Sequence, residues 1–269
     1  KVLEHPDFTD APYYEDERLA DNPYKKMLAG LWRESPVGQL TDSQSLMTMA
    51  SLLHLDAEEK GVLPALIKKS GLPAKKWLSQ YLNAYLSPLL HCFYKYSLVF
   101  MPHGENLIMI MENHVPVGMF MKDIGEEVCL LNSDHVLPDG VDRIAVNMPK
   151  EMEVLSVFTD MFDGFFRYMN QILVTEMALD EGCFWEQVAN CIHDYQKENS
   201  QYQEKFDQHD LFAKDFDHSC LNRLQLGNNQ KMVDLTDPGG SLKFAGKLDN
   251  PIARYKSQVR KLNEIEEIA

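Results

Sequence analysis

The sequence predicts an α+β fold, in which a small antiparallel β-sheet is flanked by many α-helices. The sheet is expected from a hairpin, because the apolar runs "NLIMIM" and "VGMFM" lie on either side of the turn "ENHVP". With its neighbouring residues, this hairpin region covers residues 98–132. The helices are expected because apolar residues before and after the hairpin recur every three or four positions.

Before the hairpin, the longest predicted helix covers residues 73–97. Pro73 suits the first turn of a helix, whereas Pro88 lies inside the pattern and should kink or punctuate it. The apolar residues of this stretch fall on one helix face; they are Trp77, Leu78, Tyr81, Leu82, Tyr85, Leu86, Leu89 and Leu90.

After the hairpin, "EVCLLN" (127–132) predicts a third strand. From about residue 150 onward the chain is expected to be helical, apart from a loop at residues 236–251. The predicted helical segments are residues 152–178, 180–198, 203–216, 221–226 and 253–269.

The composition narrows the class of function. The net charge is −15, from 26 basic and 41 acidic residues, which argues against a surface for nucleic acid or anionic membrane. An anionic substrate would therefore need a local basic pocket. The five cysteines form no CxxC pair, a pattern that favours free thiols in a reducing compartment.

The ends and the hydropathy of the chain give two further expectations. No apolar run approaches the ~18 residues of a membrane helix, and no secretory signal opens the chain, so we expect a cytoplasmic protein. The first residue is Lys1 rather than methionine, so we expect a piece of a longer protein.

Polar residues gather at the open end of the hairpin. His103, Glu105 and Asn106 precede its first strand, and Lys122 and Asp123 follow its second. Antiparallel pairing places these two groups beside each other. Carboxylate and amide oxygens suit a divalent metal, and cations suit phosphate charge. The cluster therefore predicts a site for Mg²⁺ and a polyphosphate.

Two interpretations of this cluster are open from the pattern alone. It resembles a kinase-type nucleotide site, in which an asparagine and a later Asp-x-Gly share the metal. The glycine-rich phosphate loop and the strand lysine of a kinase are absent, which disfavours that class. The alternative is an exposed hairpin whose ends are polar, as hairpin ends usually are.

Five motifs in one order carry a family resemblance: "LAGLWRESP" (28–36), "PHGENLIMIM" (102–111), "KDIGEE" (122–127), "LNRLQL" (221–226) and "DNPIARY" (249–255). The chain resembles the C-terminal half of siderophore synthetases that work without a peptide-synthetase template, the aerobactin-synthetase-like (IucA/IucC) family. Glu105 and Lys122 stand where many members carry glutamine and arginine. In this respect the chain is similar to the hydroxamate branch, which builds desferrioxamine-, putrebactin-, bisucaberin- or alcaligin-type products.

The resemblance implies an organisation and partners. Residues 1–60 would be the end of a preceding, fingers-like domain and a linker, and residues 61–269 a palm-like, mainly helical domain of a hand-shaped synthetase. Members of the family are longer, and their triphosphate clamp and HPxxK motif are not visible here. The expected partners are therefore the missing N-terminal half of the same enzyme, a small hydroxamate-diamine substrate and a second copy of the chain in a homodimer.

The resemblance also implies an ATP-dependent ligase. Such an enzyme activates a carboxylate as an acyl-adenylate, releases pyrophosphate, and forms a C–N amide bond when an amine attacks. In the hydroxamate branch the acid is an N-hydroxy-N-succinyl-diamine, and the product is joined and closed into a ring. The alternatives are a citrate-using, aerobactin-type synthetase and a nucleotide-binding module without catalysis.

The implied cofactors are ATP and Mg²⁺, and the implied metal ligands are Asn106 and Asp123. His103 would contact a phosphate or the substrate carboxylate, and Glu105 would lie beside the nucleotide. Lys122 would pair with Asp123 or reach a phosphate.

Two arginines complete the predicted site. Arg33, which with His103 and Lys122 forms the predicted catalytic set, could hold a carboxylate or phosphate through its bidentate fork. Arg223 is a weaker candidate for the same substrate contact. Each arginine could instead bridge elements of the fold.

Overall fold

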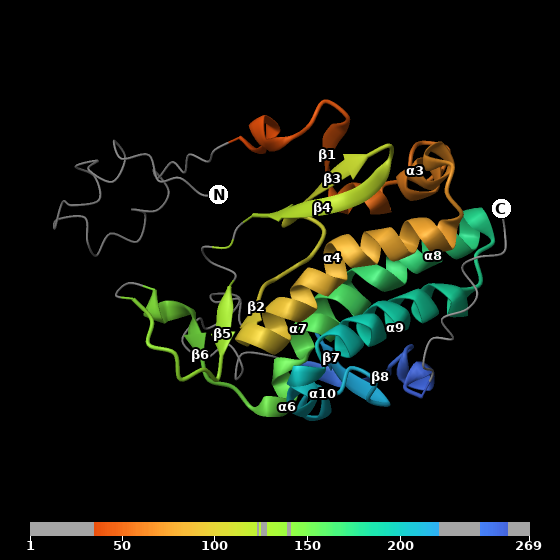
Figure 1. The fold of residues 1–269 in the computed structure, drawn as a ribbon. Coiled ribbons are helices and arrows are strands. Elements are labelled where there is room, and N and C mark those ends of the chain that lie inside the picture. Colours follow the sequence, from red (N-terminus) through yellow and green to blue (C-terminus); the bar gives the residue numbers. More distant parts are fainter. Residues whose placement is uncertain (1–34, 123, 125–127, 139–140, 221–242, 258–269) are drawn as a thin grey trace. The chain divides into compact units, whose positions relative to one another are not determined.

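The computed structural model describes residues 35–122, 124, 128–138, 141–220 and 243–257 (Figure 1). The chain divides into two compact units, residues 1–43 and residues 44–269. In the first unit a 3₁₀ helix, η3 (Pro36–Gln39), follows Ser35, whose hydroxyl accepts a hydrogen bond from the Val37 N–H at 3.4 Å.

Helix α4 (Ala74–Tyr96) is the centre of the second unit. Its predicted apolar face is confirmed, because all eight residues of that face are buried. Figure 1 shows α4 beside the other long helices, with a small sheet over it. The described α-helices are α3 (Val62–Ser70), α4 (Ala74–Tyr96), α6 (Lys150–Glu153), α7 (Leu155–Val157), α8 (Arg167–Met177), α9 (Glu181–Glu198) and α10 (Gln203–Gln208).

A π-helix and several 3₁₀ helices lie between or beside these α-helices. Between α7 and α8 the chain forms a π-helix, η6 (Phe158–Phe166), which packs its phenylalanines into the core. The described 3₁₀ helices of this unit are η4 (Met49–Leu53), η5 (Asp142–Ile144), η7 (Ser200–Tyr202) and η8 (Ala253–Tyr255). Of the two effects predicted for Pro88, a kink or an end of the helix, the second is wrong, because α4 continues past Pro88 to Tyr96. Burial of one long face stabilises α4 on both sides of the proline.

The described strands form three small sheets, with orders β1-β3-β4, β2-β5-β6 and β7-β8. Their bounds are β1 (Gln44–Thr48), β2 (Leu98–Val99), β3 (Leu107–Glu112), β4 (Val115–Met121), β5 (Cys129–Leu131), β6 (Ala145–Val146), β7 (Asp215–Ser219) and β8 (Phe244–Asp249). The α+β class and the hairpin β3–β4 are confirmed.

The prediction that residues 98–132 form a single sheet is wrong in one respect. Its two ends, β2 and β5, pair with each other in a separate sheet, to which β6 adds a parallel strand. The free edge of β3 pairs instead with β1, in the register Leu46↔Ile110. β1 and η4 thus pack with the hairpin, and the division at residue 60 into a preceding and a palm-like domain stays a prediction.

We expect the region after residue 150 to be helical apart from one loop, and this prediction is wrong in part. β7 and β8 pair antiparallel, with Phe216 opposite Leu248. Apolar and polar residues alternate only weakly in these two strands, and each strand depends on a partner far along the chain. Local periodicity therefore could not reveal them. The predicted helix at residues 221–226 lies outside the described residues, and of the predicted terminal helix only the start, η8 and two following residues, is described.

A buried polar network joins the second sheet to the helices. The Glu153 carboxylate accepts from the Asn132 amide at 2.6 Å and lies 3.3 Å from His209 Nε2. Glu153 and His209 are 6% and 7% exposed. His209 Nδ1 is buried without a hydrogen-bond partner among the described residues, so a proton added there would meet no acceptor.

This network predicts a loss of stability in mild acid. Burial lowers the pKa of His209, and Lys205 and Lys150 lower it further, against the opposing effect of Glu153. The unfolded chain, with a histidine pKa of about 6.5, therefore takes up the proton first. We expect the free energy of unfolding to be fully retained above about pH 6.5 and to fall below it.

Urea unfolding at a series of pH values measures this effect. Between pH 7 and the lowered pKa of His209, the free energy of unfolding of His209→Gln should depend less steeply on pH than that of the wild type. His135→Gln, at an exposed histidine, is the matched control and should leave the dependence unchanged. Equal slopes for wild type and His209→Gln would show that His209 is not the group responsible.

Among the described residues, no helix has both the length and the apolar character needed to cross a lipid bilayer.

Candidate functional site

The open end of the β3–β4 hairpin brings the predicted site residues together. Leu107 pairs with Met121 at this end, and the next residues outward continue the ladder, because the Lys122 N–H donates to the Asn106 carbonyl at 2.9 Å. The expectation that residues before the first strand lie beside those after the second is therefore confirmed for Asn106 and Lys122.

A tight turn precedes the first strand and orients Asn106. The Asn106 N–H donates to the His103 carbonyl at 3.0 Å. The side-chain Nδ2 of Asn106 donates to the Met101 carbonyl at 3.0 Å and lies 3.1 Å from Nε2 of His103. Asn106 is only 4% exposed. The backbone thus fixes which way the amide faces, and its oxygen Oδ1 is the atom that could coordinate a cation.

The histidine contact has a consequence for the ring nitrogens of His103. When the Asn106 amide donates to Nε2, that nitrogen acts as an acceptor, and Nδ1 is the nitrogen left to donate to a ligand. His103 and Lys122 are half-buried, and Glu105 in the same turn is exposed. The described part of the site therefore offers an amide oxygen, an imidazole, a carboxylate and an ammonium within one turn and its facing strand.

Two contacts that the sequence did not reveal support this turn. The Gly104 carbonyl accepts from the Ala50 N–H at 2.8 Å, and a Cβ added at Gly104 would lie 2.8 Å from the Phe165 ring and 2.9 Å from the Ala50 Cα. The Pro102 carbonyl accepts from the Tyr85 hydroxyl at 2.7 Å. The sequence had marked Tyr85 as a core residue only, and no local signal pairs it with Pro102.

Three predicted site residues lie outside the described residues, namely Arg33, Asp123 and Arg223. Their roles stay predictions. Within the part of the chain that the structure describes, no group of three or more histidine, cysteine, aspartate or glutamate side chains could hold a metal ion.

The chain is similar to known proteins over most of its length. The family described as "Ferric iron reductase FhuF-like transporter" matches residues 75–234, more than half of the chain. A putrebactin synthase of Shewanella sp. (strain MR-4) is 52% identical over 244 residues, which cover 91% of this chain and 39% of that relative.

Two solved structures share the fold. The aerobactin synthetase IucC of a hypervirulent Klebsiella pneumoniae pathotype matches with a TM-score of 0.69 at 22% identity, covering 85% of this chain and 40% of that one. The ATP-bound aerobactin synthetase IucA of the same source matches with a TM-score of 0.57 at 14% identity, covering 82% of this chain and 38% of that one.

This chain spans about 40% of the length of the relatives that it matches. The matched region contains the hairpin, its turn and the helices that support it. The chain therefore belongs to the FhuF-like family, and the resemblance of its motifs to the aerobactin-synthetase-like siderophore synthetases is confirmed.

Proposed function

We propose that the chain is the C-terminal part of an ATP-dependent siderophore synthetase that forms amide bonds through an acyl-adenylate. The observation that carries this proposal is the Asn106–His103 pair, held at 3.1 Å beside Lys122, in a chain 52% identical to a putrebactin synthase. The acid would be an N-hydroxy-N-succinyl-diamine, joined and closed into a ring as a hydroxamate siderophore.

The residues of the turn fit the magnesium ion that such a reaction uses. Mg²⁺ prefers oxygen ligands and takes only one or two from the protein when it binds a nucleotide. Asn106 offers Oδ1 from a side chain already oriented by the Met101 carbonyl. Asp123 follows Lys122 directly and would supply the second oxygen. The ion would neutralise phosphate charge as pyrophosphate leaves.

The other residues would orient the reacting groups. His103 would donate through Nδ1 to a phosphate or to the substrate carboxylate. Lys122 and Arg33 would add positive charge, which an acidic chain needs locally to hold a triphosphate. Glu105, exposed in the turn, would lie beside the nucleotide, and Arg223 would contact the substrate.

The proposed reaction has two chemical steps. A carboxylate oxygen of the acid attacks the α-phosphorus, an acyl–phosphate bond forms, and pyrophosphate leaves. The amine of a second molecule then attacks the acyl carbon, its nitrogen releases one proton to water, the amide forms, and AMP leaves with the oxygen that bridged it. Positioning of the two substrates supplies much of the rate, because the reacting atoms must approach within about 3–3.5 Å.

Pyrophosphate exchange into ATP tests this proposal in the complete gene product. We expect exchange that requires N-hydroxy-N-succinyl-diamine and is absent with citrate. Exchange with citrate alone would instead identify an aerobactin-type synthetase, and Mg·ATP binding with no exchange for any such acid would identify a binding module. Asp123→Asn should abolish the exchange while the protein stays folded.

The proposal extends to the missing partner. The relatives are more than twice as long as this chain, and the remaining half would supply the triphosphate clamp. We also propose a cytoplasmic location, since the substrates of the reaction include ATP, and a homodimer, which the family resemblance implies.

Calorimetry on residues 1–269 alone tests the need for that half. The net charge of −15 opposes a triphosphate of about −4, and the few local cations cannot offset it. We expect weak Mg·ATP binding and no acyl-adenylate for the isolated chain, with both restored by the remaining half. Micromolar affinity together with adenylate formation would place the whole phosphate clamp within these residues.

A further inference from the structure

One face of α4 carries a row of stacked aromatic side chains. Trp77 and Tyr81 stack with their ring centres 5.8 Å apart, and Tyr81 and Tyr85 with theirs 5.5 Å apart. The first and last of the three donate to the hairpin region: Trp77 Nε1 to the His114 carbonyl at 2.9 Å, and the Tyr85 hydroxyl to the Pro102 carbonyl at 2.7 Å. The row therefore holds the hairpin at its turn and at the loop that enters it.

Tyr85 is placed to make a constant hydrogen bond. It is 1% exposed, and its ring meets Phe166 edge-on at 5.8 Å. Burial raises the pKa of Tyr85 well above its usual value, and the charge of Asp160 acts in the same direction. The raised pKa keeps the hydroxyl protonated at neutral pH, where it donates to the Pro102 carbonyl.

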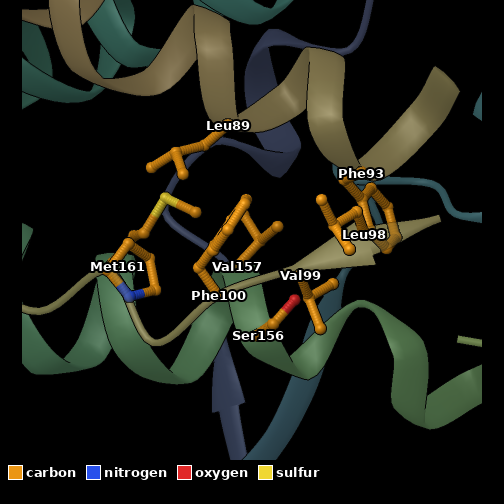
Figure 2. A pocket seen from close by; sticks show the side chains of 9 residues that line it. Leu89, Phe93, Leu98, Val99, Phe100, Ser156, Val157 and Met161 are labelled. Atoms are coloured by element: carbon orange, nitrogen blue, oxygen red, sulfur yellow. The ribbon is translucent and has the colours of Figure 1, made fainter. Parts of the chain in front are cut away.

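The surroundings of Pro102 contain little that could replace this bond. Pro102 borders a small cavity between α4, β2 and the α7–η6 helix (Figure 2). Its other walls are almost entirely apolar, and they are formed by Leu89, Phe93, Leu98, Val99, Phe100, Ser156, Val157 and Met161. The Ser156 hydroxyl already donates to the Glu153 carbonyl at 3.3 Å.

The cavity beside Pro102 is small. The space in it that a water-sized sphere can occupy is about 10 Å³, at the lower limit for one water molecule. Pro102 is buried, so without the Tyr85 hydroxyl its carbonyl would lack a donor among the described residues. A buried carbonyl without a partner is unfavourable, and the loop would shift to find one.

We propose that Tyr85 is a positioning residue, whose hydroxyl fixes the loop that orients Asn106 and His103. The Pro102 carbonyl, which Tyr85 holds, follows the Met101 carbonyl, which accepts from the Asn106 amide. A shift of this segment therefore turns the amide and breaks its 3.1 Å contact with His103. This role in catalysis rests on the proposed function, whereas the effect on the loop does not.

Tyr85→Phe tests the role against a matched control. Tyr81→Phe removes an equally buried hydroxyl from the same helix face, but that hydroxyl contacts Met49 Sδ at 3.3 Å rather than the loop. In the complete gene product we expect kcat for acid-dependent pyrophosphate exchange to fall about 10-fold or more in Tyr85→Phe, and to stay within about twofold in Tyr81→Phe. Equal rates for Tyr85→Phe and wild type, or equal losses in both variants, would overturn the role in catalysis.

Amide hydrogen exchange tests the loop without any activity. In the same protein, the Asn106 N–H, bonded to the His103 carbonyl, should exchange about 10-fold faster in Tyr85→Phe than in Tyr81→Phe. If the wild-type protein catalyses no pyrophosphate exchange, the proposed function is refuted. The comparison of amide hydrogen exchange between the two variants would still decide the role of Tyr85 in the loop. Equal amide exchange in the two variants would refute that role.

Discussion

Replacing Asn106 by alanine should lower acid-dependent pyrophosphate exchange by about 10²-fold or more. Enzymes lose this much rate when they lose one preorganised polar group that stabilises the transition state. Asn106 Oδ1 is the predicted magnesium ligand, and the amide also positions His103 Nε2 at 3.1 Å. Both interactions end with the substitution. Steady-state exchange assays in the complete gene product, at saturating ATP and acid, measure the loss.

Asn170→Ala is the control for this variant. Asn170 is also 4% exposed, but it lies on α8 and takes no part in the proposed site. The two substitutions each remove one buried amide. A similar fall in exchange for both would mean that Asn106 acts only through packing.

Replacing Gly104 by alanine should destabilise the protein and disable the site together. The added Cβ would lie 2.9 Å from the Ala50 Cα and 2.8 Å from the Phe165 ring, closer than carbon atoms pack. Backbone atoms cannot move aside as a flexible side chain can. We expect a loss of about 1–3 kcal/mol in the free energy of unfolding, and a fall in exchange activity because His103 and Glu105 flank the displaced residue.

Gly118→Ala separates this clash from the general effect of losing a glycine. Gly118 lies on β4, where an added Cβ would meet only the flexible end of the Ile110 side chain, at 3.4 Å. Thermal unfolding of both variants gives the comparison. Equal midpoints for Gly104→Ala and wild type would show that the close approach at Ala50 and Phe165 is not tight.

The parts of the fold that the sequence predicted depend on local patterns. The buried face of α4 was predictable because one periodic pattern runs through the whole helix. The β3–β4 hairpin was predictable because its strands are adjacent in the chain. By contrast, β1 reaches β3 from far along the chain, and β7 reaches β8 across residues 220–243. Such pairings are set by tertiary packing rather than by local propensity.

The same distinction applies to the candidate site. Antiparallel geometry alone placed Asn106 beside Lys122, and the backbone hydrogen bond at 2.9 Å confirms this placement. The contacts that fix the turn were not predictable, because Tyr85, Ala50 and Phe165 approach it from other elements. Tyr85 carried only the signal of an apolar helix face, which does not reveal a hydroxyl contact.

The route of one oxygen atom shows whether the acid is activated by adenylation. The complete gene product is supplied with ATP, an amine and N-hydroxy-N-succinyl-diamine whose carboxylate is labelled with ¹⁸O, and the nucleotide products are examined by mass spectrometry. An acyl-adenylate requires one labelled oxygen to leave with AMP, and none to appear in pyrophosphate. Formation of ADP, with the label in inorganic phosphate, would mean that the carboxylate attacks the γ-phosphorus and would contradict adenylation by this site.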